Sequence, residues 1–280
     1  MHIFTSPESL YNHLRSLATA DLHLGFVPTM GALHEGHLAL VRQSVDENTY
    51  TVCSIFVNPI QFNNPDDLQR YPRTLEADCA MLEAAGCDCV FAPSAEEMYA
   101  ATPVLKLDFG DLERVMEGAF RPGHFNGVGL VVGRLFNLVQ PQRAYFGQKD
   151  LQQVAVVRRL IQDLGFPIEL VSCPTIRELD GLALSSRNRR LSLEYRAMAP
   201  FIFQMLNEAK AKLQSGASID DVRAFVKEEF LTHPEFLLEY FEVAHATTLQ
   251  PIEALQPDGQ TALCVAANLG GVRLIDNLVF

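Results

Sequence analysis

Short apolar runs with the length of buried strands alternate with longer amphipathic stretches through the first two thirds of the chain. The apolar runs are residues 24–28, 51–57, 89–91, 144–146 and 168–171. The stretches between them carry apolar residues at helical spacing and are residues 37–48, 75–85, 127–140 and 151–164. Two of these helix candidates end near Gly86 and Gly165. Strands that alternate with helices predict an α/β fold, in which a parallel sheet is covered by helices on both faces.

The last third of the chain has a different pattern. Two consecutive helix-like stretches, residues 192–215 and 219–230, are separated by a short Gly-Ala-Ser segment. Short strand candidates then follow at residues 236–244, 261–267 and 272–275. The last two flank the sequence Asn-Leu-Gly-Gly and predict a hairpin. We therefore expect a boundary near Thr175, with a larger sheet domain at residues 1–175 and a smaller α+β C-terminal domain at residues 176–280.

Composition and charge narrow the class of protein. The chain has 280 residues, of which 48% are hydrophobic and 20% charged, so it can bury a sizeable core and is not of the disordered type. Acidic residues outnumber basic ones by 34 to 22, which gives a net charge of -12 and disfavours a nucleic-acid partner. If the substrate is anionic, the positive charge that binds it must be concentrated at a local site.

The N-terminus and the cysteines predict the compartment. The first residues lack the basic and apolar segments of a secretory signal, and no stretch has the apolar length of a membrane span. The six cysteines include no Cys-x-x-Cys pair, which argues against a disulfide framework or a zinc ribbon. We expect a cytoplasmic protein without a membrane partner, whose thiols are reduced and mostly buried.

The loop at residues 27–37 follows the first apolar run and opens a helix. His34 and His37 are three residues apart, so they share one face on the first turn of a helix. The helix N-terminus adds unpaired N–H groups and a positive dipole, which is typical of a phosphate site. Gly36 has no side chain, so a planar base or a ribose could lie against the backbone. The alternative is two surface histidines at a helix start.

Two more loops after strand candidates carry groups that suit phosphate. In the first, Gly147 allows close backbone approach, Lys149 supplies a point charge and Asp150 could cap the helix. In the second, at residues 177–188, two serine hydroxyls and Arg187 can bond several phosphate oxygens at once. The alternatives are an N-cap beside a solvated lysine and a polar interdomain loop. Because the carboxyl ends of parallel strands converge, the three loops together favour a nucleotide site.

Two further stretches resemble a second ligand pocket. Gln61 follows the second long apolar run, and its amide can donate to a carboxylate and accept from a hydroxyl or an amine. These properties suit a small hydroxy acid. Arg121 and His124 lie in a Gly- and Pro-containing loop and offer a further contact to an anion, although an ordinary helix lead-in explains that loop equally well.

These motifs together resemble the pantothenate synthetase family of pantoate:β-alanine ligases. That family belongs to the nucleotidyltransferase superfamily and shares the His-x-Gly-His signature with class I aminoacyl-tRNA synthetases. The resemblance covers essentially the whole chain and rests on residues 28–37, 56–62, 71–74, 121–125, 146–150 and 182–188. Gln148, where many relatives have Glu, and Leu184, where some have Met, are mild variants.

The resemblance implies a Rossmann-like sheet domain for nucleotide and pantoate, a C-terminal lid domain and a homodimer. It also implies an AMP-forming carbon-nitrogen ligase of pantothenate and coenzyme A biosynthesis. Such an enzyme condenses (R)-pantoate with β-alanine through a pantoyl adenylate, releases AMP and diphosphate from ATP, and normally uses Mg²⁺. We expect the loop around residues 184–187 and the C-terminal domain to close over the site, because a free adenylate hydrolyses.

The resemblance also implies roles for individual residues. The residues expected to act in catalysis are His34, His37, Lys149, Ser185 and Arg187, with His37 in the position usually assigned as proton donor. The residues expected to bind ATP are Met30, Gly31, Ala32, Leu33, His34, Glu35, Gly36, His37, Gly147, Gln148, Lys149, Asp150, Ile176, Leu184, Ser185, Ser186 and Arg187. The residues expected to bind the other substrates are Gln61, Gln153, Asn58 and Arg121.

Metal ligands and rival functions stay open at this point. Asp78 is a candidate Mg²⁺ ligand, but a surface carboxylate on a helix is the favoured interpretation. One rival is a nucleotidyltransferase that transfers a whole nucleotidyl group and does not release AMP. The other is a non-catalytic module that binds a nucleotide or RNA, which the acidic balance and the complete set of pocket loops both disfavour.

Overall fold

The structure is a computed structural model that describes residues 1–19 and 21–280. Its strands are β1 (His2–Phe4), β2 (Leu24–Thr29), β3 (Tyr50–Ile55), β4 (Cys89–Phe91), β5 (Arg143–Gly147), β6 (Glu169–Cys173), β7 (Phe236–His245), β8 (Thr261–Leu269) and β9 (Val272–Val279). Its α-helices are α1 (Pro7–Leu17), α2 (Glu35–Glu47), α3 (Pro65–Arg70), α4 (Leu75–Ala84), α5 (Ala95–Met98), α6 (Met116–Phe120), α7 (His124–Val139), α8 (Leu151–Leu164), α9 (Leu193–Met198), α10 (Phe201–Gln214) and α11 (Ile219–Leu231). Short 3-10 helices are η1 (Pro59–Gln61), η2 (Gly110–Glu113), η3 (Gln148–Asp150) and η4 (Ser186–Arg190).

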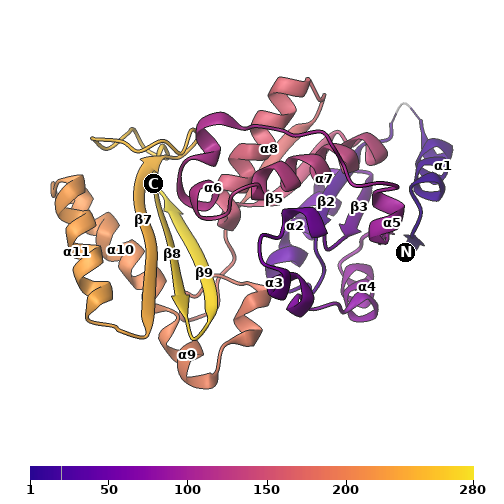
Figure 1. Ribbon diagram of the computed structural model, residues 1–280. Coiled ribbons are helices and arrows are strands. Elements are labelled where there is room, and N and C mark those ends of the chain that lie inside the picture. Colours follow the sequence, from indigo (N-terminus) through magenta and orange to yellow (C-terminus); the bar gives the residue numbers. More distant parts are fainter. Residues whose placement is uncertain (20) are drawn as a thin grey trace.

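The strands form two sheets, which Figure 1 shows in two neighbouring parts of the molecule. The first sheet has six strands in the order β1-β4-β3-β2-β5-β6, and every neighbouring pair is parallel. The second sheet has three antiparallel strands in the order β7-β8-β9. The predicted fold class, a Rossmann-like parallel sheet followed by a smaller α+β part, is confirmed.

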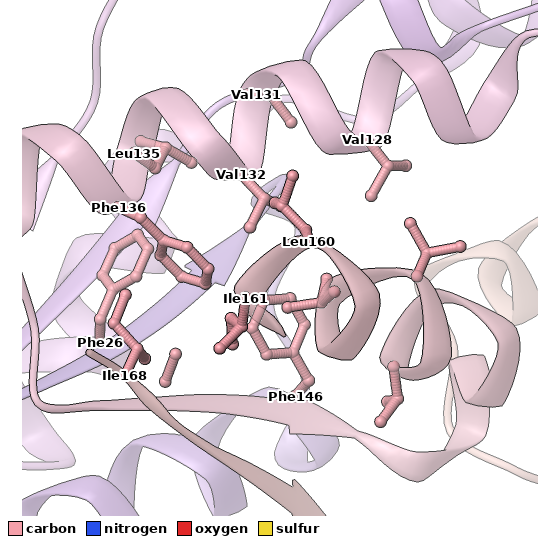
Figure 2. Packing of buried hydrophobic residues seen from close by; sticks show 14 of the residues in the cluster. Phe26, Val128, Val131, Val132, Leu135, Phe136, Phe146, Leu160, Ile161 and Ile168 are labelled. Carbon is pink, nitrogen blue, oxygen red and sulfur yellow. The ribbon is translucent and has the colours of Figure 1, made fainter. Parts of the chain in front are cut away.

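Alternation along the strands supplies both faces of the parallel sheet. Phe26 of β2 and Phe146 of β5 pack with α1, α7 and α8, whereas Val27 and Tyr145, their chain neighbours, pack with α2 and α4. Figure 2 shows α7 and α8 with the two phenylalanine rings of the first face. Because successive strand residues point to opposite faces, runs that are apolar at every position become strands buried on both sides. The prediction of helices on both faces is confirmed.

Two helix ends follow the glycines that predicted them. Helix α8 ends at Leu164, and Gly165 after it has a φ of +66°. Helix α4 ends at Ala84, and Gly86 has a φ of +85°. This left-handed conformation carries no Cβ penalty in glycine, so glycine ends a helix at low cost.

The second sheet is covered by helices α10 and α11, which share its apolar core. The single helix expected at residues 192–215 is wrong, because the chain forms α9 and α10 with a break at Ala199 and Pro200. Proline has no N–H to continue the ladder of helix α9. Strand β9 also continues past the expected end at Ile275, because the polar residues that follow are buried and hydrogen-bonded. Strand β1 and helix α1 were not among the predicted elements.

Residues 1–175 and 176–280 pack against each other through apolar side chains and an ion pair between Glu117 and Arg273. One core cluster lies wholly within the C-terminal part, at residues 182–280. The main core includes Leu249, Ala262 and Cys264 from the C-terminal part together with residues of the parallel sheet. No helix among the described residues is long and apolar enough to cross a membrane.

Candidate functional site

A cavity of about 210 Å³ opens at the carboxyl ends of β2, β3, β5 and β6. Parallel α/β sheets bind their ligands at this edge. Most of the expected site residues line it. They are Met30, His34, Gly36, His37, Gln61, Arg121, Gly147, Lys149, Asp150, Gln153, Ile176, Leu184, Ser185, Ser186 and Arg187.

The other expected residues lie next to this lining. Glu35 points to the surface and pairs with Arg42 at 3.0 Å. Gln148 offers its backbone carbonyl to Asn277. The remaining members of this group are buried or backbone positions, namely Gly31, Ala32, Leu33 and Asn58.

Asp78 supports the loop that carries the two histidines. Its carboxylate accepts hydrogen bonds from the backbone N–H groups of Ala32 at 2.9 Å and Leu33 at 2.8 Å. The Thr74 hydroxyl donates to it at 3.1 Å. Ala32 has a φ of +51°, and these bonds hold the backbone in that strained conformation. The expectation of a surface carboxylate is wrong, because only 1% of Asp78 is exposed.

His34 and His37 lie side by side at the start of α2. The His34 Nδ1 accepts from the backbone N–H of Gly36 at 3.1 Å and caps the helix. The two ring centroids are 4.0 Å apart. The Nδ1 of His37 is buried and has no hydrogen-bond partner among the described residues. The ring itself lines the cavity, so its accessible edge can contact a ligand.

Burial lowers the pKa of both histidines. The pKa of His34 falls to about 3, because burial and the neighbouring His37, Lys149 and Arg189 outweigh the opposing charge of Asp150. The pKa of His37 falls to about 4, because of burial and the charge of Lys149. Both rings are therefore neutral at pH 7, so each offers one N–H donor and one acceptor nitrogen.

In the ligand-free protein the ring resonances of His34 and His37 are expected not to titrate between pH 8 and about pH 5. An unfolded histidine titrates near pH 6.5, so acid favours the unfolded state. The stability that these two rings contribute is present above that pH and is lost as the pH falls toward 4. NMR titration of the C2 protons measures this, with the protein in urea as the control. A folded-state midpoint near 6.5 for either ring contradicts it.

Three cationic or hydroxyl groups line the same cavity as the histidines. Lys149 is mostly buried, and its Nζ lies 3.7 Å from the Asp150 carboxylate. Ser185 caps η4 by accepting from the backbone N–H of Arg187 at 3.3 Å. The Arg187 guanidinium pairs with Asp67 at 3.0 Å, and Asp67 also binds Arg190. Sequence reasoning missed Asp67, because nothing local marks an α3 carboxylate as the partner of a distant loop.

The amide of Gln61 lies at the other side of the cavity. Its Oε1 accepts from the Nδ2 of Asn58 at 3.1 Å, and its Nε2 lies 3.2 Å from the Sδ of Met30. Asn58 is fixed in turn by the carbonyl of Gly127 at 3.0 Å. Asn58 therefore positions Gln61 from behind the cavity wall.

His124 holds the backbone of the same segment. Its Nδ1 donates to the carbonyl of Gln61 at 2.8 Å, and its Nε2 accepts from Arg121 at 3.1 Å. This pattern requires a neutral ring, and burial together with the charge of Arg121 lowers the pKa of His124 to about 4. The Arg121 guanidinium thus borders the cavity beside Gln61.

The fold and the site define an α/β nucleotide-binding protein, with phosphate-suited groups on several strand ends and an amide-lined pocket beside them. The chain matches the family described as pantoate-beta-alanine ligase over residues 2–279. It is 47% identical over 276 residues to the pantothenate synthetase of Cytophaga hutchinsonii, with 98% of each chain covered.

Two solved structures give the same result. The crystal structure of pantothenate synthetase from Thermus thermophilus is 46% identical, with a TM-score of 0.92, and the match covers 100% of this chain and 99% of that one. The pantoate-beta-alanine ligase from Francisella tularensis, complexed with beta-gamma ATP and beta-alanine, is 30% identical, with a TM-score of 0.79 and 100% and 97% covered. The chain belongs to the pantoate-beta-alanine ligase family, and the resemblance read from its motifs is confirmed.

Proposed function

We propose that the protein joins pantoate to β-alanine with ATP through a pantoyl adenylate, and releases AMP and diphosphate. The observation that carries this proposal is one cavity that combines His34, His37, Lys149 and Arg187 with the amide of Gln61. The cationic and neutral donors suit a triphosphate, and the amide suits a hydroxy acid. The Francisella relative, whose structure holds beta-gamma ATP and beta-alanine, supports the same substrates.

ATP would occupy the part of the cavity between the α2 N-terminus and the η3 and η4 loops. The side chains of Lys149, Ser185 and Arg187 are the donors available to its phosphates. Ile176 and Leu184 supply apolar surface for the base. The other residues expected at the ATP site would act by setting the conformation of the backbone around it. They are Gly31, Ala32, Leu33, Glu35 and Gln148.

Pantoate would lie against Gln61 and Gln153, with Arg121 near its carboxylate. In the first step a pantoate carboxylate oxygen attacks the α-phosphorus, the bond to the bridging oxygen of the diphosphate breaks, and diphosphate leaves. In the second step the β-alanine amine attacks the acyl carbon, the bond to the phosphate oxygen breaks, AMP leaves and the amine loses a proton. Positioning and charge stabilisation by the fixed donors do most of this work.

Because the His37 ring is neutral, it would act in the first step as a hydrogen-bond donor. At pH 7 its ring can donate one hydrogen bond to a phosphoryl oxygen without carrying a full charge. A bound triphosphate brings negative charge, which raises the pKa of the ring and favours a shared or transferred proton. We assign His37 as the donor to the phosphoryl oxygens on this basis.

The residues of the cavity fit an Mg²⁺ ion that is bound through one carboxylate and the substrate phosphates. A site built from protein side chains alone is not present, because the described residues contain no cluster of three or more His, Cys, Asp or Glu side chains that could hold a metal. Asp150, with about half of its side chain exposed, is the carboxylate that lines the cavity beside Lys149. Mg²⁺ commonly binds through one carboxylate and substrate phosphates, and there it would neutralise the charge of the diphosphate. Asp78, buried and engaged by backbone N–H groups, does not fit as a ligand.

We propose that residues 1–175 and 176–280 form two domains and that the η4 loop closes the site between them. The loop already contacts the first domain, because Arg187 pairs with Asp67 and Arg189 donates to the Leu33 carbonyl at 3.1 Å. Limited proteolysis between residues 177 and 191 is expected to slow when ATP and pantoate are both present. Cleavage at residues 232–235 is the internal control. Unchanged cleavage of the η4 loop with both substrates contradicts closure.

We also propose a cytoplasmic homodimer without nucleic-acid or membrane partners. Val104 and Leu105, in the connection before η2, are 95% and 62% exposed and offer apolar surface to a second copy. A monomeric mass by light scattering contradicts the dimer.

All six cysteines are free thiols, which fits a reducing compartment, and cell fractionation tests this.

Product analysis tests the reaction itself. Incubation with ATP, pantoate, β-alanine and Mg²⁺ is expected to give AMP, diphosphate and pantothenate in equal amounts. Diphosphate without AMP favours the nucleotidyltransferase rival, because a whole nucleotidyl group would then remain on the acceptor. ATP binding with no turnover favours a non-catalytic binding module.

A further inference from the structure

The last strand of the chain contacts the loop that carries Lys149. The Nδ2 of Asn277 on β9 donates to the backbone carbonyls of Gln148 and Lys149, each at 2.9 Å. Only 4% of Asn277 is exposed. The orientation of its amide is fixed, because the opposite one would place Oδ1 against two carbonyl oxygens. The amide thus bonds to successive residues of η3, whose side chains border the candidate site.

Asn277 is itself held by a buried ion pair. The Asp276 carboxylate accepts from the backbone N–H of Asn277 at 2.8 Å and from both terminal nitrogens of Arg177, at 2.6 and 2.9 Å. Arg177 also donates to the Asn277 carbonyl at 3.1 Å. Its guanidinium lies 3.7 Å from the centre of the Phe203 ring. Bidentate geometry, ring contact and burial leave Asn277 little freedom to move.

The same ion pair reaches the second phosphate-suited loop. The Arg177 side chain donates to the carbonyl of Gly181 at 3.0 Å, and the Arg177 backbone forms an antiparallel β-bridge with Ala183. These contacts shape the segment that leads into Ser185 and Arg187. One network on β9 therefore fixes the bases of both loops.

We propose that Asn277 is a positioning residue for the adenylate-forming step, which it serves by holding the η3 backbone so that Lys149 points into the cavity. This inference rests on the proposed function for the chemistry, and on the two 2.9 Å bonds for the positioning. A displacement of about 1 Å in a group that stabilises developing charge can lower turnover about 100-fold. Loss of the Asn277 amide should therefore lower kcat, because the ammonium of Lys149 remains present but is less well placed.

The test compares Asn277→Ala with Thr261→Val, a matched control in the same sheet. Thr261 is buried, and its hydroxyl accepts from the backbone N–H of Gln256 at 3.0 Å and donates to the Gln256 carbonyl at 3.5 Å, so this control also removes side-chain hydrogen bonds at a buried position. Asn277→Ala is expected to lower kcat about 10- to 100-fold, with the KM for ATP changed less than about 3-fold. Thr261→Val is expected to leave kcat unchanged.

Two further readouts separate positioning from general stability. In a Lys149→Ala background, Asn277→Ala is expected to change kcat less than about 3-fold, because its effect acts through that lysine. Amide hydrogen exchange of residues 147–153 in the ligand-free protein is expected to accelerate about 10-fold or more in Asn277→Ala and not in Thr261→Val. If Asn277→Ala fails to fold, Asn277→Leu keeps a side chain of similar shape and removes the donor without adding a charge, with the same expectations.

Three results would overturn the proposal. They are a kcat within about 3-fold of the parent enzyme, an equal loss in the Lys149→Ala background, and unchanged exchange of residues 147–153. Failure of the proposed function has a different signature. In that case the parent enzyme makes no pantoyl adenylate, while the exchange measurement still decides whether Asn277 holds the loop.

Discussion

Replacing Lys149 or His37 by alanine is expected to lower kcat about 100- to 1,000-fold, while the KM for ATP rises less than about 5-fold. Lys149 is a mostly buried ammonium at the cavity, and His37 is a neutral ring whose Nδ1 has no partner among the described residues. In the proposed reaction both would face the region where negative charge grows as the α-phosphorus is attacked. Interactions that strengthen in the transition state raise kcat rather than substrate affinity, so their loss appears in turnover.

Steady-state kinetics with two controls tests this division of roles. Lys227→Ala removes an exposed lysine on α11 and is expected to leave both constants unchanged. Gln61→Ala is expected to raise the KM for pantoate about 10-fold, with a smaller change in kcat, because its amide holds the ground-state substrate. Similar modest effects from Lys149→Ala, His37→Ala and Gln61→Ala contradict the assignment.

Glu117→Ala is expected to lower the free energy of unfolding by about 3–5 kcal/mol. Glu117 on α6 lies in the first part of the chain, and its carboxylate accepts two hydrogen bonds from Arg273 on β9, at 2.8 and 2.7 Å. Tyr240 on β7 donates to it at 2.9 Å. Only 6% of Glu117 is exposed, and its removal leaves the partly buried Arg273 guanidinium with Glu239 as its remaining carboxylate partner.

Urea unfolding at pH 7 measures this loss. Asp111→Ala breaks an exposed ion pair with Arg114 and is the control, expected to cost no more than about 1 kcal/mol. Burial raises the pKa of Glu117, but the hydrogen bonds and charge of Arg273 outweigh it and hold the pKa below its usual range. The stabilisation is therefore present above the unfolded pKa and is lost as the pH falls through the folded one. A loss equal to that of Asp111→Ala contradicts a structural role for the pair.

Local pattern was enough to predict most of the fold. Apolar runs became β2 to β6, because residues such as Phe26 and Val27 are buried on opposite faces of a covered sheet. The hairpin of β8 and β9 followed from the glycine pair between them. The pattern failed where polar residues continue a strand, as at Asp276 and Asn277, since their burial depends on distant partners.

The candidate site shows the same limit. His34, Lys149 and Arg187 could be predicted to line this cavity because each lies in a connection that follows a strand, where parallel sheets bind ligands. The supporting roles of three other residues could not be predicted, because their partners are distant in the sequence. Asp78 bonds to Ala32, 46 residues away, and Asp67 bonds to Arg187, 120 residues away. Asn277 bonds to Lys149, 128 residues away. A single sequence carries no local signal for such pairs, so the supporting contacts emerge only from the three-dimensional structure.

Isotope exchange between ATP and labelled diphosphate tests the central claim most directly. With Mg²⁺ present and β-alanine absent, exchange is expected only when pantoate is added, because reversal of adenylate formation returns the label to ATP. Lys149→Ala is expected to reduce this exchange by the same factor as kcat if adenylate formation limits turnover. Exchange without pantoate, or none with pantoate while ATP is bound, would contradict the assignment of this cavity to pantoyl adenylate formation.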